Sequence, residues 1–228
     1  MDKKKVILVL GASGGIATEL NKFLNKRYLI YLFYFKNKPK HLKNTKSIKL
    51  DLQNYSKIRS TLNQMKIKNK KIIILNLAAV KFDKISYNID NSDLEKTFKI
   101  NTFSFLNFVQ YFLPQMIKEK WGRVINFSST GGSAGEKGTL LYTTSKIATH
   151  GIIKVMSKEY AQFNITFNTI ELGNFNFGLF KKLNPKMREK IISNIPSKKT
   201  GNIKDIYNAI NFISFFFILF FFIKLFTK

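Results

Sequence analysis

The feature that most constrains the fold is a regular alternation of short apolar runs with longer segments of helical periodicity. The runs are rich in Val, Ile, Leu and Phe, which favours buried strands. Strands are predicted at Val6–Leu10, Leu29–Phe35, Ser47–Leu50, Ile72–Leu75, Val124–Phe127 and Thr166–Ile170. Helices are predicted at Ile16–Lys26, Tyr55–Met65, Leu94–Lys118 and Tyr142–Phe163. Apolar strands that alternate with helices indicate a parallel sheet covered on both faces.

No internal repeat or Pro/Gly-rich linker divides the chain, which has 228 residues and only four prolines. That length suits one large α/β domain. We therefore predict a doubly wound α/β fold of the Rossmann type, with three layers (α/β/α), as a single domain over residues 1–214. Residues 215–228 form a separate Phe-rich apolar tail.

A glycine-rich loop follows the first predicted strand and opens the first predicted helix. It reads Gly11-Ala-Ser-Gly-Gly-Ile-Ala17. Glycines allow the backbone to turn tightly and to approach a pyrophosphate, and the helix N-terminus offers free N–H groups and a positive dipole end. Because the loop lies inside a βαβ unit, we predict a dinucleotide site.

The second strand of that unit ends without the acidic residue that would bind a ribose 2′-hydroxyl. Lys36 and Lys38 follow the strand instead. An acid at this place favours NAD, whereas a cation can pair with the 2′-phosphate of NADP. The sequence therefore favours NADP(H) over NAD(H).

The formal charge of the chain is +26, with 39 Lys and Arg against 13 Asp and Glu. A basic chain suggests nucleic-acid binding, but 35 of these cations are Lys and only four are Arg. Arg is the residue that recognises phosphate and guanine in bidentate fashion. Lys, Ile, Phe and Asn share AT-rich codons, so base composition explains the excess, and we expect no nucleic-acid partner.

Other function classes are excluded by what the sequence lacks. There is no Cys and there are only two His, which argues against a disulfide scaffold, a thiol nucleophile and a metal site. The first apolar run, Val6–Leu10, is shorter than the roughly 7–15 residues of a signal-peptide core. We therefore expect a cytoplasmic protein without a metal.

A candidate catalytic group follows the fifth predicted strand. Ser128 and Ser129 end this strand, and Tyr142 and Lys146 are spaced i, i+4 on the next helix, so they share a face. A lysine ammonium beside a phenol favours the phenolate and lowers the pKa of the tyrosine. Such a tyrosine can exchange a proton with a carbonyl or alcohol oxygen, while a serine hydroxyl holds that oxygen.

These motifs together resemble the short-chain dehydrogenase/reductase family, and most of all its 3-oxoacyl-[acyl-carrier-protein] reductases. The resemblance covers residues 4–214 and rests on Gly11–Ala17, Asp51, Asn76-Leu-Ala-Ala79, Asn101, Ser129, Tyr142, Lys146 and Leu172-Gly173. The spacings agree as well, with 25, 28 and 13 residues separating Asn76, Asn101, Ser129 and Tyr142 in turn. The resemblance implies hydride transfer between a nicotinamide cofactor and a carbonyl or secondary alcohol, with a place in fatty acid biosynthesis.

The resemblance also implies a role for each catalytic residue. Tyr142 would be the general acid/base, and Lys146 would lower its pKa and bind the nicotinamide ribose. Ser129, chosen over Ser128 by its spacing from Tyr142, would position the substrate oxygen. Asn101 would support a water that relays protons through Lys146.

Further residues would contact the cofactor. Asp51 would bond the adenine amino group, and Asn76 would lie near the adenosine ribose. The complete set implied is Gly11, Ser13, Gly14, Gly15, Ile16, Lys36, Asp51, Leu52, Asn76, Ala78, Tyr142, Lys146 and Gly173.

Some positions depart from the family pattern. Phe177 replaces a threonine that would contact the nicotinamide amide. Of two basic positions that help some members dock an acidic acyl carrier protein, Lys120 keeps one and Phe163 replaces the other. A homodimer or homotetramer is implied, but the altered C-terminus affects the segment that usually builds the interface.

The C-terminus departs most. Where the family has a loop, a last strand and an Asp-Gly-Gly, this chain has Phe215–Lys228, so we expect the last strand to be missing or altered. Three interpretations of the tail remain open: a membrane contact, a buried strand or helix, and a frameshift in a homopolymeric tract. As a helix, the run Phe212–Ile223 would span ~18 Å, less than the ~30 Å core of a bilayer.

Three functional hypotheses follow. The first is an NADP(H)-dependent oxidoreductase that acts on a carbonyl such as a 3-oxoacyl thioester, or on a polyol, sugar or steroid alcohol. The second is a nucleotide-binding protein without efficient turnover. The third is a protein held at a membrane by Phe212–Phe226.

Overall fold

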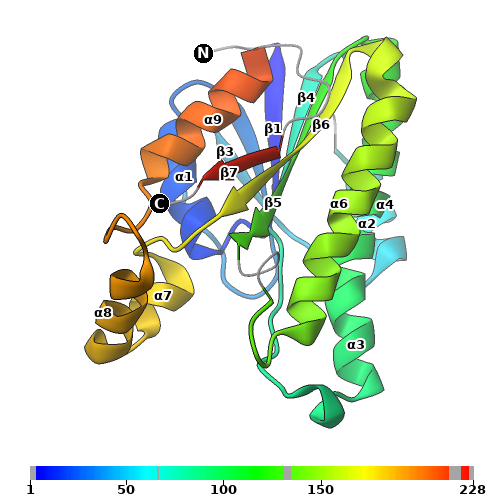
Figure 1. Cartoon of the computed structure of the whole chain (residues 1–228). Helices are drawn as coiled ribbons and strands as arrows, with labels where there is room; N and C mark the ends of the chain where they lie inside the picture. The colour runs from blue at the N-terminus through cyan, green and yellow to red at the C-terminus, as the bar shows by residue number, and fades with distance from the viewer. Residues whose placement is uncertain (1–3, 66, 131–134, 216–221, 226–228) are drawn as a thin grey trace.

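The computed structural model of the chain describes residues 4–65, 67–130, 135–215 and 222–225 (Figure 1). Within these residues, seven parallel strands form one sheet in the order β3-β2-β1-β4-β5-β6-β7. They are β1 (Lys5–Leu10), β2 (Leu29–Tyr34), β3 (Thr45–Lys49), β4 (Lys71–Asn76), β5 (Gly122–Ser129), β6 (Ile165–Leu172) and β7 (Phe222–Leu225). The predicted doubly wound α/β fold is confirmed, and β1 to β6 correspond to the six predicted strands.

Helices cover both faces of the sheet, as Figure 1 shows. One face packs against α1 (Gly15–Leu24) and α9 (Ile203–Phe215), and the other against α2 (Tyr55–Asn63), α4 (Ser104–Lys118) and α6 (Leu140–Tyr160). Successive residues of a strand point to opposite faces. Accordingly Val6 and Leu8 of β1 join the core beneath α2, α4 and α6, whereas Ile7 and Val9 join the core beneath α1 and α9.

The strand order reverses between β1 and β4. From β1 the chain proceeds outward to β2 and β3, then returns to place β4 on the other side of β1. Leu10 and Asn76, the last residues of these two strands, are paired in register. In open α/β sheets, a crevice for ligands lies outside the carboxyl ends of the strands at such a point.

The helical segment predicted at Leu94–Lys118 begins earlier and is interrupted. It consists of α3 (Asn91–Phe98), a π-helical turn over Lys99–Phe103, and α4. The hydrophobic periodicity predicted one continuous helix, because a single π-helical turn barely changes the spacing of the apolar residues. Such π turns are frequent at functional sites, and this one contains Asn101.

Two short helices follow β6 at the carboxyl ends of the strands. These are α7 (Gly178–Lys182) and α8 (Pro185–Asn194), and Figure 1 places them on the side of the sheet that carries α1 and α9. Asn184 caps α8, because its side-chain oxygen accepts a hydrogen bond from the Met187 N–H and Pro185 occupies the first turn.

The C-terminal tail decides between the two alternatives for the last strand, which is altered in sequence and not missing. Residues 222–225 form β7, which pairs in parallel with residues 169–172 of β6. Phe and Ile favour the extended backbone of a sheet, so a short strand forms although the family's sequence pattern is absent. The run Phe212–Ile223 is therefore not one element: α9 continues to Phe215, and residues 216–221 lie outside the described residues. Within the described residues, none of the helices combines the length and apolar character needed to cross a bilayer.

Candidate active site and cofactor cleft

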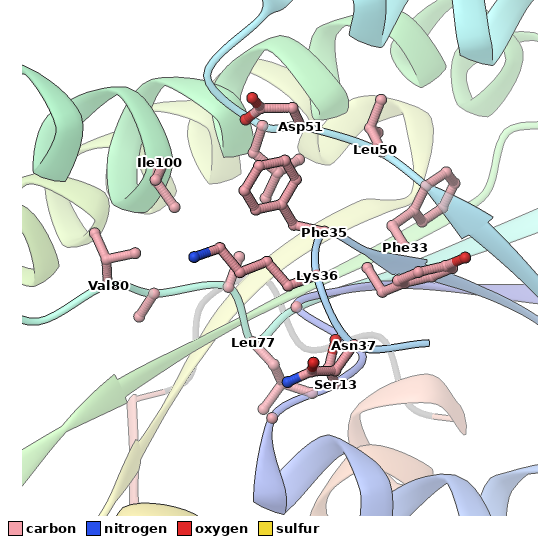
Figure 2. Close-up of a pocket in the computed structure, with 16 residues that line it drawn as sticks. Ser13, Phe33, Phe35, Lys36, Asn37, Leu50, Asp51, Leu77, Val80 and Ile100 are labelled. Carbon is pink, nitrogen blue, oxygen red and sulfur yellow. The ribbon is translucent and has the colours of Figure 1, made fainter. Parts of the chain in front are cut away.

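A cavity of about 310 Å³ lies at the carboxyl ends of β1, β2 and β4 (Figure 2). Its walls come from the glycine-rich loop, from the segments after β2, β3 and β4, and from the π turn. The lining residues are Gly11, Ser13, Gly14, Phe33, Tyr34, Phe35, Lys36, Asn37, Leu50, Asp51, Leu52, Leu77, Ala78, Ala79, Val80 and Ile100. Seven of the thirteen residues that the sequence assigned to a cofactor line this one cavity.

Gly11 shows why the loop requires glycine. Its backbone has a φ of +75°, and a Cβ added to it would lie 2.6 Å from the Cα atom of Ala78. Any side chain would therefore combine a strained backbone with a collision against the segment after β4. The glycine allows the two strand ends to approach each other at the floor of the cavity.

The other end of the loop forms the beginning of α1. Gly14 is the N-cap residue and Gly15 is the first residue of the helix. Gly15 and Ile16 are not among the residues that line the cavity. Instead, a Cβ on Gly15 would lie 2.5 Å from the Cα atom of Gly178, so Gly15 lets α7 pack closely on the start of α1.

Polar groups after β2 and β3 lie opposite the glycine-rich loop. Figure 2 shows the exposed Lys36 with its amine directed toward the side of the pocket formed by Val80 and Ile100. Asp51 is fixed by its own turn, because its Oδ1 atom accepts a hydrogen bond of 2.9 Å from the Gln53 N–H. A cation and a carboxylate thus line the same cavity.

A second cavity, of about 330 Å³, adjoins the first. The two share Ala79 and Val80 in their walls. The second cavity is lined by Ala79, Val80, Lys81, Ser129, Thr130, Glu136, Thr139, Tyr142, Gly173 and Asn174. Three of the predicted site residues, Ser129, Tyr142 and Gly173, therefore lie in one chamber beside the glycine-rich cavity.

Tyr142 and Ser129 are hydrogen-bonded through their side chains. Burial raises the pKa of the Tyr142 phenol, the Ser129 hydrogen bond opposes this effect, and the Glu136 carboxylate adds to it. This differs from the expectation of a lowered pKa. Burial of the phenolate makes the largest contribution to the pKa of Tyr142. Because this pKa is raised, Tyr142 stays protonated across neutral pH.

Lys146 lies on the same face of α6 as Tyr142 and is almost completely buried. Its Nζ atom is 5.9 Å from the centroid of the Tyr142 ring and donates a hydrogen bond of 2.9 Å to the carbonyl of Phe127. Burial lowers the pKa of Lys146 to about 8. The amine is thus held by a carbonyl of β5 beside the phenol, with its charged form disfavoured.

Asn101 is fully buried in the π turn and is held on both sides of its amide. Its Oδ1 atom accepts a 2.8 Å hydrogen bond from the Val80 N–H, and its Nδ2 atom donates to the Val80 carbonyl at 2.9 Å. The same Nδ2 atom donates to the Ser145 hydroxyl of α6 at 2.9 Å. Asn101 therefore joins the segment shared by the two cavities to α6, the helix of Tyr142 and Lys146.

Comparison with known proteins agrees with this geometry. The family model described as short chain dehydrogenase matches residues 5–188, which is most of the chain. The chain belongs to the short chain dehydrogenase family. It is 30% identical over 220 residues to "3-oxoacyl-[acyl-carrier-protein] reductase FabG" of Buchnera aphidicola subsp. Schizaphis graminum, covering 93% of this chain and 90% of that protein. It is also 30% identical over 217 residues to the protein of the same name from Rickettsia typhi, covering 92% and 89%.

Solved structures show the same fold. The structure named "ElxO with NADP Bound" superposes with a TM-score of 0.83 at 21% identity, and the match covers 97% of each chain. A structure of a single-residue variant of ElxO with NADPH bound gives a TM-score of 0.84 at 20% identity, covering 97% of this chain and 96% of that one. The fold of this family member is thus shared over nearly its whole length.

Asn76, which the resemblance places near the adenosine ribose, lies directly before Leu77 of the first cavity wall and is itself buried. Its side chain has no exposed surface, and it is not among the residues that line either cavity. Its Nδ2 atom donates a 2.9 Å hydrogen bond to Oδ1 of Asn126 on β5. The residue joins two strands beneath the cleft, because at the last position of β4 its side chain points into the protein.

The segment that departs from the family pattern lies at the α1 end of the cleft. Phe177 stacks on Phe175, with their ring centroids 6.3 Å apart, and precedes the positive-φ Gly178 that packs on Gly15. An aromatic pair therefore takes the place of the expected threonine hydroxyl. Lys120, at the C-terminal end of α4, is exposed, and Phe163 packs partly buried against the core.

The polar residues that support the site were not predicted. Ser145 donates to the Tyr142 carbonyl at 2.8 Å and its own carbonyl accepts from Thr102 at 3.1 Å. Asn126 and Thr149 form a further chain of hydrogen bonds toward Lys146. One signal in the sequence could have indicated these residues. Asn126 is a polar residue inside an apolar strand, at a position where burial is predicted. Glu136 and Lys81, on the wall of the second cavity, were also not predicted.

Proposed function

We propose that this member of the short chain dehydrogenase family is an NADP(H)-dependent oxidoreductase that reduces a carbonyl group to a secondary alcohol. The observation that carries the proposal is the junction of the two cavities at Ala79 and Val80. It sets Tyr142 and Ser129 beside a chamber built on a glycine-rich loop. A cofactor in the first cavity and a substrate in the second would therefore be neighbours.

The residues of the first cavity fit a dinucleotide. The backbone at Gly11, which has no room for a Cβ atom, and the start of α1 suit a pyrophosphate. Backbone N–H groups and the helix dipole favour an anion there. Asp51 offers an acceptor for the adenine amino group. When bound, the nicotinamide supplies or accepts the hydride, which is chemistry that no side chain of the chain provides.

The residues of the second cavity suit the proton transfer. Ser129 would donate a hydrogen bond to the substrate oxygen and hold it beside the Tyr142 hydroxyl. Because the raised pKa keeps Tyr142 protonated, its Oη–H can pass a proton to the developing alkoxide of a carbonyl that is being reduced. Lys146, held by the Phe127 carbonyl, keeps an amine next to the phenolate that remains.

The preference for NADP(H) rests on Lys36. It lines the first cavity directly after β2, where an acidic residue would favour NAD. A lysine can pair with a 2′-phosphate, whereas an acid would repel it. Lys36 therefore favours NADP(H), which carries the 2′-phosphate, over NAD(H), which lacks it.

A 3-oxoacyl thioester is the substrate that the comparisons favour, since both relatives at 30% identity carry that activity in their names. Such a substrate would be presented by an acyl carrier protein, and the exposed Lys120 provides one cation for an acidic partner. We also propose a cytoplasmic location, because the proposed cofactor and the proposed carrier protein are both water-soluble.

The experiment is a turnover assay with purified protein, NADPH or NADH, and an acetoacetyl thioester. We expect loss of the nicotinamide absorbance with NADPH, and at least about tenfold lower efficiency with NADH. Replacement Lys36→Glu should reverse this preference. Tight NADPH binding without oxidation by any carbonyl in a panel would contradict the proposal and favour a nucleotide-binding protein without turnover.

A further inference from the structure

Lys146 is attached to β5 by both of its ends. At the side chain, Nζ donates to the Phe127 carbonyl at 2.9 Å. At the backbone, the Lys146 carbonyl accepts a 2.6 Å hydrogen bond from the hydroxyl of Thr149, one turn further along α6. Thr149 in turn accepts a 2.9 Å hydrogen bond from Nδ2 of Asn126, the residue directly before Phe127.

In this series of hydrogen bonds each donor and acceptor is fixed. The Thr149 hydroxyl uses its proton on the Lys146 carbonyl, so it can only accept from Asn126, which presents its amide N–H to the hydroxyl. Asn126 then turns its Oδ1 atom toward β4, where it accepts from Asn76 at 2.9 Å. The donor order thus fixes the orientation of both amides and of the hydroxyl.

These hydrogen bonds lie in the interior of the protein. Asn76, Asn126 and Thr149 have no exposed surface, and Lys146 is 3% exposed. Hydrogen bonds in such a low-dielectric setting are strong, and a group that loses its partner there carries the full desolvation cost. Apolar side chains could fill the space between β5 and α6 without any hydrogen bond, so the paired asparagine and threonine call for a reason.

The reason we find is the position of Lys146. We propose that Asn126 and Thr149 are positioning residues that hold the Lys146 amine at a fixed distance from the Tyr142 phenol. The inference rests on the proposed function, in which that amine supports proton transfer by Tyr142. Loss of the Thr149 hydroxyl releases one turn of α6 from β5, and small displacements of a catalytic group reduce the rate severely.

The test replaces Thr149 with Val, which keeps the shape and removes the hydroxyl, and with Ser, which keeps the hydroxyl. For Thr149→Val we expect kcat to fall about tenfold and KM for NADPH to change less than kcat, because Lys146 is displaced while the residues that line the first cavity stay in place. Thr149→Ser should recover most of the lost rate. The matched control is Thr97→Val, since Thr97 is also a fully buried threonine of a helix and its hydroxyl has no hydrogen-bond partner among the described residues.

A second measurement needs no turnover. With tyrosine labelled at ¹³Cζ, the signal of Tyr142 is identified among the nine tyrosines as the one absent from Tyr142→Phe. That signal also reports the titration of Lys146 near pH 8, because the Lys146 Nζ atom lies 5.9 Å from the Tyr142 ring centroid. In Thr149→Val this step in the Tyr142 titration should move from about 8 toward 10.5, because a displaced amine is less desolvated. Thr97→Val should leave that titration unchanged.

The outcomes separate the inference from the proposed function. If the unsubstituted protein reduces no carbonyl, the proposed function fails, and the tyrosine titration still decides the positioning role. If Thr149→Val keeps both the kcat of the unsubstituted protein and its Tyr142 titration, the inference is wrong and the proposed function stands. Should Thr149→Val not fold, Thr149→Ala is measured in the same way, with the same two readouts.

Discussion

At the scale of single residues, the site holds the amine of Lys146 in the protein interior, where burial disfavours its charged form. Lys146 is nearly fully buried, and its pKa is lowered from 10.5 to about 8 by desolvation. The folded protein therefore binds fewer protons than the unfolded chain between these two pH values. Below about pH 8 the folded state must carry a buried charge, which costs on the order of 3 kcal/mol.

Replacement of Lys146 with Met should therefore stabilise the protein and inactivate it. We expect the free energy of unfolding at roughly pH 7 to rise by about 1–3 kcal/mol, because the buried charge is removed and an apolar chain of similar length remains. The advantage should shrink as the pH rises from about 8 toward 10.5. Urea unfolding across that range measures it, with Lys158→Met on the exposed side of α6 as control. Equal stability of Lys146→Met and the unsubstituted protein at all pH values would contradict this expectation.

Gly11 gives a second prediction at this scale. Gly11→Ala should lower the free energy of unfolding by about 2 kcal/mol or more and weaken NADPH binding, because its Cβ would strike Ala78 and its φ is +75°. The control is Gly151→Ala within α6, where a Cβ meets no atom of the described residues within 4 Å. That change should stabilise the protein by about 0.5–1 kcal/mol. Equal effects of the two substitutions would contradict the role assigned to Gly11.

At the scale of elements, sequence patterns predicted the strands well and the interruptions poorly. The apolar runs gave β1 to β6 because buried parallel strands are nearly continuous in Val, Ile, Leu and Phe. The π turn at Lys99–Phe103 was missed, since it depends on hydrogen bonds between Asn101 and the distant Val80. The strand β7 stayed one of three open interpretations, because one composition, rich in Phe, continues from α9 into β7.

The pairing of β7 with β6 leads to a prediction about the tail. A chain that ends at residue 221 loses the ladder between residues 169–172 and 222–225 and leaves β6 as an open edge. An exposed edge strand lowers stability and promotes association. We expect a lower unfolding temperature and soluble aggregates in size-exclusion chromatography. An unchanged unfolding temperature would instead favour the interpretation of the tail as a frameshift product.

At the scale of the whole molecule, the sequence predicted which residues lie together better than which residues support them. Ser129, Tyr142 and Lys146 were recognisable by spacing, because a helix turn and a strand end fix where they lie. The bond from Asn76 to Asn126 was not predicted, and Asn126 and Thr149 were overlooked. Their bonds join residues 50 and 23 positions apart, and no local pattern records which buried polar groups meet across a sheet.

The surface of the molecule carries a prediction about assembly. Leu140, Ile147 and Val155 of α6 are 48%, 51% and 56% exposed, and the neighbouring Phe103 is 47% exposed. We expect this row to be covered by a second copy in a homodimer or homotetramer. Light scattering should show a smaller molar mass for Ile147→Glu combined with Val155→Glu, and no change for Met187→Glu, because the exposed Met187 belongs to α8 on the side of the sheet opposite α6 (Figure 1). If the unsubstituted protein is a monomer, the expectation that a second copy covers this row of α6 is wrong.

The central claim is that Tyr142 transfers the proton in a reaction driven by NADPH. The most direct measurement compares Tyr142→Phe with the unsubstituted protein in NADPH binding and in reduction of an acetoacetyl thioester. Phenylalanine keeps the ring in its buried position and removes only the hydroxyl that bonds to Ser129. We expect nearly equal affinity for NADPH and a loss of kcat of about 100-fold or more in the variant. Equal kcat in the two proteins would contradict the claim.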